Sequence, residues 1–316
     1  MAKTSATLIQ LPPDKIKRNP ANPRIIFREQ EMQELLDSID EVGIRVPIIV
    51  YEERQRYVLI DGERRWRCAT KLNLRAMPAI VHPKPTKLEN LLMMFNIHNV
   101  RVAWDLLPMA FKLREIRDLI AKQGQPTNYK HLSAITGLSA PTVKRAFELL
   151  DLPMKYQNLL LKEAKKPKEK QEVTADLFVE IIKSRNVIER YIPEVFDEVT
   201  PRKYLDSMVA KYRAKIIPSV TAFRSVSKIA RAERAGESPQ EAAPVIVQLV
   251  TDPQFTIDEA YEQTVKRAYQ YRDLTTQADK LASEIHRYRS IRRMPEPLRE
   301  SLRKLRAELN RLFGRE

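Results

Sequence analysis

Ile60-Asp-Gly-Glu-Arg-Arg-Trp-Arg-Cys68 is the stretch that decides how the first part of the chain folds. A strand-like apolar run ends at Ile60, Gly62 lets the backbone turn tightly, and helical periodicity starts at Glu63. Exposed N–H groups at the start of such a helix attract an anion, and guanidinium groups hold phosphate oxygens in pairs. The residues alone leave two interpretations open: a phosphate-binding turn, or a solvated basic helix with Trp66 packed in the core.

The segments on both sides of this stretch predict a small α+β domain. Gly43 is expected to end a helix as a C-cap, and a polar turn is expected to join two strands into a hairpin. A third strand follows the helix that begins at Glu63. The expected elements are a helix over residues 30–42, a hairpin of strands 46–51 and 56–60 with its turn at 52–55, a helix over 63–72 and a strand over 77–81.

Beyond residue 88 the strand signal gives way to helical periodicity. Helices are expected over 88–94 and 106–122, and helical segments continue to residue 235, followed by one strand-like run at Val245–Val250. The predicted fold class is therefore an α+β N-terminal domain followed by mainly α domains. The predicted divisions are 1–87 for the N-terminal domain, 88–161 for a helical domain, 162–172 for a charged linker and 173–316 for a helical C-terminal region.

The last segment carries apolar stripes at 4-3-4-3 spacing on either side of Met294-Pro-Glu-Pro297. This spacing predicts a helical hairpin with coiled-coil-like faces. The stripes either pack on each other within one chain or pair with a second chain, and the sequence leaves both arrangements open. The first stripe contains Leu274, Ala278, Leu281, Ile285 and Tyr288, and the second contains Leu298, Leu302, Leu305, Leu309 and Leu312.

Leu132-Ser-Ala-Ile-Thr-Gly-Leu-Ser-Ala-Pro-Thr-Val143 predicts a helix-turn-helix. Gly137 supplies a left-handed turn residue after a helix over 129–136, and Ser139 can cap a second helix whose first turn tolerates Pro141. The early positions of that helix are expected to face the major groove or the flanking phosphates of DNA. An ordinary helical hairpin is the competing interpretation. The candidate DNA-binding residues are Ser139, Ala140, Thr142, Lys144 and Arg145.

The composition narrows the class of protein. The 316 residues carry a formal net charge of +15, and such an excess favours a polyanion such as nucleic acid as a partner. The single cysteine, Cys68, excludes an intramolecular disulfide and an all-cysteine zinc site. No apolar stretch approaches the roughly 18 residues of a membrane span, and the first residues lack the pattern of a signal peptide. We therefore expect a cytoplasmic protein with no membrane partner.

Three blocks follow one another along the chain: Asn19-Pro-Ala-Asn-Pro-Arg24, Gly43-Ile-Arg-Val-Pro-Ile-Ile-Val50 and Gly62-Glu-Arg-Arg-Trp-Arg67. Their order resembles the ParB/Spo0J family of chromosome and plasmid partition proteins. The resemblance covers residues 11–152 and includes the predicted helix-turn-helix. It implies a domain that binds CTP with Mg²⁺, a helix-turn-helix that reads a palindromic centromere site, and a homodimeric clamp around double-stranded DNA. It also implies a location on the nucleoid or a plasmid and a ParA-type ATPase as partner, although the basic, leucine-containing peptide that usually contacts this ATPase is not evident.

The resemblance also implies the residues of a nucleotide site, with several departures. Val46 stands where the family usually has Gln or Thr, and His98 replaces a glutamine. Phe95 replaces the glutamate tied to metal binding and hydrolysis, and a phenylalanine has no oxygen to coordinate Mg²⁺ or orient water. Asn96 is then the one implied Mg²⁺ contact, and CTPase activity is in question. The implied nucleotide-binding residues are Gly43, Pro47, Gly62, Glu63, Arg64, Arg65, Arg67 and Asn96.

Two other functions compete with partition. A ParB-like transcription regulator would use the same DNA-binding parts, and the sequence does not separate it from a partition protein. A nuclease on the same N-terminal fold would need clustered acidic metal ligands. Asp61 and Glu63 flank Gly62, but the motif contains no third carboxylate.

Overall fold

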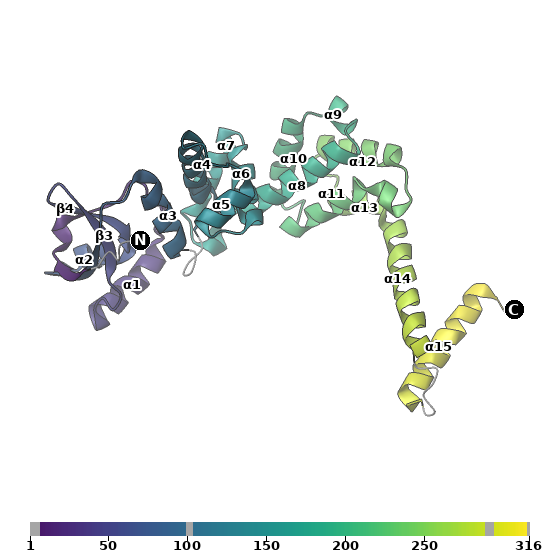
Figure 1. Ribbon diagram of the computed structural model, residues 1–316. Coiled ribbons are helices and arrows are strands. Elements are labelled where there is room, and N and C mark those ends of the chain that lie inside the picture. The colour runs from purple at the N-terminus through teal and green to yellow at the C-terminus, as the bar shows by residue number, and fades with distance from the viewer. Residues whose placement is uncertain (1–6, 99–103, 288–293, 315–316) are drawn as a thin grey trace.

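The computed structural model describes residues 7–98, 104–287 and 294–314. Figure 1 shows a small sheet domain at the N-terminal end, a helical body, and one long helix that projects from this body, with the last helix beyond its far end. The predicted fold class, an α+β N-terminal domain followed by mainly α domains, is confirmed.

The N-terminal domain is built on a five-stranded mixed sheet in the order β1-β5-β3-β4-β2. β3 and β4 form the predicted hairpin, but the turn predicted at 52–55 is too long. Only Arg54 and Gln55 turn, with φ of 51° and 61°, and a two-residue turn of this kind matches the twist of the paired strands. The two outer strands, β1 and β2, were not predicted. The strands are β1 (Thr7–Leu11), β2 (Ile16–Lys17), β3 (Ile48–Glu53), β4 (Arg56–Asp61) and β5 (Met77–His82).

Three helices accompany the sheet and position its loops. Gly43, at φ 72°, ends the first helix as predicted, and its N–H donates to Ile39 O at 2.9 Å. Buried Leu36, Ile39 and Cys68 hold the first helix on the second. The third helix contacts β4. These helices are α1 (Glu29–Val42), α2 (Glu63–Lys71) and α3 (Lys87–His98).

The middle of the chain follows the predicted helices closely. Asn128 caps α5 through a hydrogen bond from the His131 N–H (2.8 Å), and the helix ends at Gly137. Buried Leu132 and Val143 belong to one core with residues of α3 and α4. The helices here are α4 (Leu106–Lys122), α5 (Tyr129–Thr136), α6 (Ala140–Leu150) and α7 (Met154–Ala164).

The stretch 162–172, predicted as a linker, is mostly exposed, but Glu163 anchors it by specific contacts. Glu163 is 4% exposed, its carboxylate accepts the Glu172 N–H at 2.8 Å, and it pairs with Lys166 at 2.6 Å. Leu160 before the stretch and Val173 after it lie in the same hydrophobic core. The one buried carboxylate of the stretch, that of Glu163, is therefore both hydrogen-bonded and ion-paired.

The helical body continues with α8 to α13. The strand predicted at Val245–Val250 is wrong, because this run lies inside α12. Ala242, Ile246 and Leu249 are buried at helical spacing, and a short, fully buried apolar run does not distinguish a strand from a helix. The helices are α8 (Ala175–Tyr191), α9 (Val195–Glu198), α10 (Pro201–Arg213), α11 (Phe223–Ile229), α12 (Pro239–Thr251) and α13 (Ile257–Gln263).

Two long helices, α14 (Lys266–Arg287) and α15 (Glu296–Phe313), carry the predicted apolar stripes. Neither has a buried residue, and the two helices diverge from their connection (Figure 1). Leu274 is 63% exposed and Leu312 is 77% exposed, so the stripes do not form a core with each other. Tyr288 of the first stripe lies outside the described residues. The pairing within one chain that the sequence left open is therefore not formed.

Candidate anion-binding cavity and nucleic-acid interface

The strand, turn and helix predicted around Gly62 are present. β4 ends at Asp61, Gly62 has φ 93° and ψ 24°, and α2 begins at Glu63. A β-carbon on Gly62 would lie 2.5 Å from Cγ2 of Ile48, which is fully buried. No side chain caps the start of α2, so the N–H groups of its first turn can donate to a bound group. This geometry suits an anion.

A cavity of about 230 Å³ lies at this turn. It brings together four residues of the predicted nucleotide site, namely Gly62, Glu63, Arg64 and Arg65. Four others, Gly43, Pro47, Arg67 and Asn96, do not line it. The remaining walls come from Asn22, Arg24, Leu35, Val46, Asp61 and Ile97.

Arg64 and Arg65 leave α2 in different directions. Arg64 donates from Nη2 to the Glu31 carbonyl on α1 at 2.5 Å. Arg65 reaches the chain before β3, where Nη1 donates to Pro47 O at 2.7 Å, and its Nη2 pairs with Asp61 at 2.7 Å. Because each guanidinium has five N–H donors, these bonds leave Arg64 with further donors for a phosphate oxygen.

Glu63 and Arg67 lock the turn to the preceding segment. Glu63 is 5% exposed, and its carboxylate accepts from Asn22 Nδ2 at 2.7 Å and from Arg67 Nε and Nη2 at 3.0 and 2.6 Å. The Arg67 guanidinium also lies over the Phe27 ring, 4.0 Å from its centroid. Glu63 therefore lines the cavity with Arg64 and Arg65, and Arg67 holds the Glu63 carboxylate in place from outside it.

Arg24 lines the cavity but was not predicted as a site residue. Burial, followed by the nearby charge of Arg64, lowers the pKa of Arg24. Its block is fixed by Asn19, which is 3% exposed and donates from Nδ2 to Leu59 O (2.7 Å) and to Asn90 Oδ1 (3.1 Å). The signal that could have found Arg24 was its place in the Asn19–Arg24 block.

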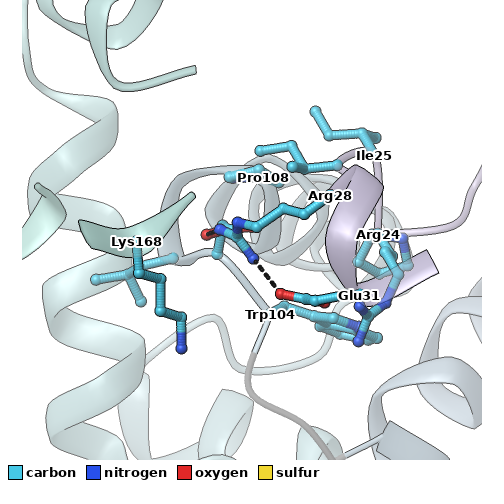
Figure 2. A pocket seen from close by; sticks show the side chains of 11 residues that line it. Arg24, Ile25, Arg28, Glu31, Trp104, Pro108 and Lys168 are labelled. Atoms are coloured by element: carbon cyan, nitrogen blue, oxygen red, sulfur yellow. Dashed lines mark hydrogen bonds and ion pairs between the residues drawn. The ribbon is translucent and has the colours of Figure 1, made fainter. Parts of the chain in front are cut away.

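A second cavity, of about 220 Å³, shares Arg24 with the first. Figure 2 shows Arg24 and Lys168 on opposite sides of it, with Arg28 and Glu31 joined by an ion pair (3.3 Å). Arg28 also pairs with Asp105 at 2.7 Å, just before α4. This cavity therefore lies where the N-terminal domain meets the helical body, and Arg24 connects it with the α2 turn.

The residues around Asn96 do not fit a magnesium site. Asn96 is exposed, whereas Phe95 is buried, 1% exposed, with its ring edge-on to Trp104 at 4.9 Å. The nearby carboxylates of Asp61 and Glu63 are ion-paired with arginines. Within the described residues, no three His, Cys, Asp or Glu side chains gather as metal ligands. A Mg²⁺ ion here would depend on ligands from outside the protein.

The helix pair α5–α6 has the predicted local geometry. Gly137 is left-handed, with φ 72° and ψ 0°, and Ser139 caps α6 by accepting the Thr142 N–H at 3.2 Å. Ser133 Oγ donates to Leu138 O at 2.6 Å, which ties the first helix to the turn. The beginning of α6 is thereby fixed by local hydrogen bonds.

The candidate DNA-binding side chains differ in exposure. Lys144 is exposed and lies 3.8 Å from Glu148, so its ion pair is loose. Ser139 is exposed, whereas Ala140, Thr142 and Arg145 are half-buried. Within the part of the chain that is described, the Arg145 Nε has no hydrogen-bond partner. The Thr142 hydroxyl is already 2.8 Å from Ser139 Oγ and the Arg145 Nε is buried, so the exposed Lys144 ammonium is the most available of these donors.

Comparison with known proteins identifies the first part of the chain. The family model of the ParB N-terminal domain matches residues 1–99. This part of the chain is therefore similar to a ParB N-terminal domain. The match contains all eight residues of the predicted nucleotide site, since the last of them is Asn96. None of the described helices is long and apolar enough to cross a membrane.

The similarity to curated relatives covers part of this chain and part of each relative. The chain is 33% identical to the chromosome-partitioning protein Spo0J of Thermus thermophilus over 48% of this chain and 54% of the relative. It is 32% identical to a nucleoid occlusion protein of Bacillus pumilus over 48% and 51%. The chain spans about half the length of the curated relatives it matches.

Solved structures of C-terminally truncated ParB from Caulobacter crescentus are also similar. The form complexed to the centromeric parS site is 23% identical, with a TM-score of 0.43 over 71% of this chain and 98% of that one. The form complexed with CTP-γ-S is 28% identical, with a TM-score of 0.29 over 56% and 92%.

Proposed function

We propose that this chain is a sequence-specific DNA-binding protein of the partition type, which reads a palindromic duplex as a homodimer. The observation that carries the proposal is the presence on one chain of a match to the ParB N-terminal domain and the capped helix pair α5–α6. In this proposal α5–α6 is a helix-turn-helix and α6 enters the major groove. Similarity to a chromosome-partitioning protein supports the biological role.

The side chains of α6 divide the work. Lys144 is a point charge suited to a backbone phosphate, and Arg145 can bind a guanine edge with two donors. Thr142 reads a base edge more weakly, because its hydroxyl first has to leave Ser139. Ser139 and Ala140 set the start of the helix against the duplex.

Selection of duplexes from a randomised library by the full chain tests the proposal. We expect one enriched palindrome. Arg145→Ala should then weaken binding by about 1–3 kcal/mol and relax preference at one position. Lys122→Ala, an exposed lysine at the end of α4, is the matched control and should change neither. Failure to enrich any sequence contradicts the proposal.

We further propose that the α2 turn binds the phosphates of a nucleoside triphosphate. Arg24 and Arg64 concentrate positive charge at one cavity, and the start of α2 has no side-chain cap. The preference for CTP follows from the family resemblance. We expect binding without turnover, because Phe95 is buried and provides no oxygen to orient water.

Calorimetry with the four ribonucleoside triphosphates tests this second proposal. Arg64→Ala should abolish binding, while the far-UV circular dichroism spectrum stays unchanged. Arg75→Ala, an exposed arginine of the same domain that does not line the cavity, should bind like the wild type. Absence of binding by all four nucleotides refutes the nucleotide site and leaves the DNA proposal standing.

The homodimer is assigned to α15 and its apolar stripe. Leu298, Leu305 and Leu309 are 37–42% exposed on one face of the helix, and heptad spacing of this kind pairs helices between chains. Light scattering should show that Leu305→Asp shifts the protein to monomer, whereas Arg306→Asp on the same helix does not. A monomeric wild type removes the assignment.

The other functions have less support. A transcription regulator would use the same α6 contacts, and similarity to a nucleoid occlusion protein shows that partition is one of several roles among relatives. For a nuclease, the described residues offer no cluster of acidic ligands. A ParA-type ATPase stays a predicted partner.

A further inference from the structure

A basic groove lies beside the proposed recognition helix and shares Lys144 with it. Its walls are the exposed side of α6, the face of α8 that begins at Glu180, and α11 with the turn that follows it. α6 packs on α8, and α8 packs on α11, so the three walls form one surface. The groove is lined by six cations (Lys144, Lys183, Arg190, Arg224, Lys228 and Arg231) and two carboxylates (Glu148 and Glu180).

Most of this positive charge is not neutralised within the protein. Glu180 pairs with Lys183 at 2.6 Å, and Glu148 is 3.8 Å from Lys144. In the described part of the chain, the other four cations of the groove have no carboxylate within ion-pair distance. The groove therefore keeps a net positive charge, and like charges that gather this closely repel one another unless an anion joins them.

Aromatic rings hold several of these cations in place. Arg190 and Arg231 lie 5.5 and 5.6 Å from the centroid of the Tyr191 ring. Lys228 lies 5.4 Å from the ring of Tyr261 and 5.3 Å from that of Tyr269. Cation–π contacts orient a charge without neutralising it. In addition, the Arg231 Nε is buried and has no hydrogen-bond partner among the described residues.

The position of the groove beside α6 indicates which anion would bind there. Lys144 belongs both to the groove and to the proposed DNA-contacting face of α6, so a duplex on α6 lies across the opening. Lys183 and Arg190 are seven residues apart on α8, a rise of about 10 Å. One DNA strand places about three phosphates over that length. The groove thus matches a run of backbone phosphates better than a single small anion.

We propose that this groove binds the sugar–phosphate backbone of the duplex that α6 engages. The inference rests on the proposed DNA-binding function and extends it to α8 and α11. The groove adds affinity and salt dependence, but no sequence preference, because phosphate contacts carry no base information.

The test compares two triple variants of the full chain that lose the same charge. Arg190→Gln, Arg224→Gln and Lys228→Gln remove three exposed cations from the groove, and Lys162→Gln, Lys170→Gln and Lys203→Gln remove three exposed lysines that do not line it. The probe is the duplex enriched by the wild type. The slope of log Kd against log salt should fall by about three for the groove variant, at about 0.9 per phosphate contact, and stay unchanged for the control.

Further arms separate the outcomes. Selection with the groove variant should enrich the same sequence as the wild type, and Arg190→Lys with Arg224→Lys should restore the slope, because lysine keeps the charge. An unchanged slope for the groove variant overturns the inference about the groove. The DNA-binding proposal still stands in that case if the wild type enriches a sequence. If the groove variant loses pyrophosphate binding but keeps the salt slope for DNA, the groove binds a small anion and the inference is also overturned. If the wild type enriches no sequence, both proposals fail.

Discussion

Replacing Gly62 by alanine should destabilise the N-terminal domain strongly. At φ 93° an alanine pays a left-handed backbone penalty of about 1–2 kcal/mol. Its β-carbon would also meet Ile48 Cγ2 at 2.5 Å and Arg65 Nη2 at 3.0 Å. Ile48 is fully buried and cannot move aside freely, so overpacking adds about 1–3 kcal/mol. Together we expect a loss of about 2–5 kcal/mol in the free energy of unfolding.

Tryptophan fluorescence in urea measures this loss. The chain has two tryptophans, Trp66 on α2 and Trp104 at the start of the helical body. Trp66 donates from Nε1 to Pro13 O at 2.9 Å, so its emission follows unfolding of the N-terminal domain. At a slope of about 2 kcal/mol per molar urea, a loss of about 2–5 kcal/mol should lower the midpoint by about 1–2.5 M.

Gly236→Ala separates the backbone penalty from the clash. Gly236 is also left-handed (φ 83°, ψ 12°), but a β-carbon there meets nothing within 4 Å. Its loss, measured by circular dichroism of the helical body, should therefore stay near 1–2 kcal/mol, about the strain alone. If Gly62→Ala costs no more than Gly236→Ala, the close approach of Ile48 to Gly62 carries no energy and the reasoning is refuted.

Three further predictions concern single contacts. Ser139→Ala should cost about 1 kcal/mol of stability and weaken DNA binding, while Ser139→Asp, which keeps the cap, should preserve stability in urea unfolding. A double-mutant cycle of Arg28→Ala and Asp105→Ala should give a coupling of about 0.5–3 kcal/mol, and additive losses would show that the pair does not join the domains. Hydrogen bonds from Thr86 lower the pKa of Glu89 below 4.5, so the start of α3 should lose protection from amide exchange as pH falls through that lowered pKa. Glu89→Gln should remove this pH dependence, and a pH-dependent loss in that variant would argue against the cap.

Local signals explain what the sequence could predict. Gly43, Gly62, Gly137 and Ser139 mark helix ends through their own backbone or side chain, so these boundaries agree with the structure. α12 was mistaken for a strand because a short apolar run such as Val245–Val247 is compatible with both a strand and a helix.

Long-range contacts explain what the sequence could not predict. Arg24 reaches the cavity only after Asn19 ties its segment to β4 and α3, far away in the chain. The short strand β2 exists only through its pairing with β4. The cations on α8 and α11 form one groove because of helix packing that no local pattern contains.

The length of α14 sets the distance between the helical body and α15. Residues 271–287 are exposed throughout, and as a helix they span about 25 Å. A partner bound to α15 is therefore separated from the helical body by the length of this exposed helix. If α15 joins two chains, the two α6 helices of the dimer are held apart by this spacer. Once one α6 has bound a duplex, the length of α14 then sets the effective concentration of the second α6 at the same duplex. Removing seven residues from α14 would shorten the spacer by about 10 Å without touching any binding surface, so geometry alone would decide whether both units engage.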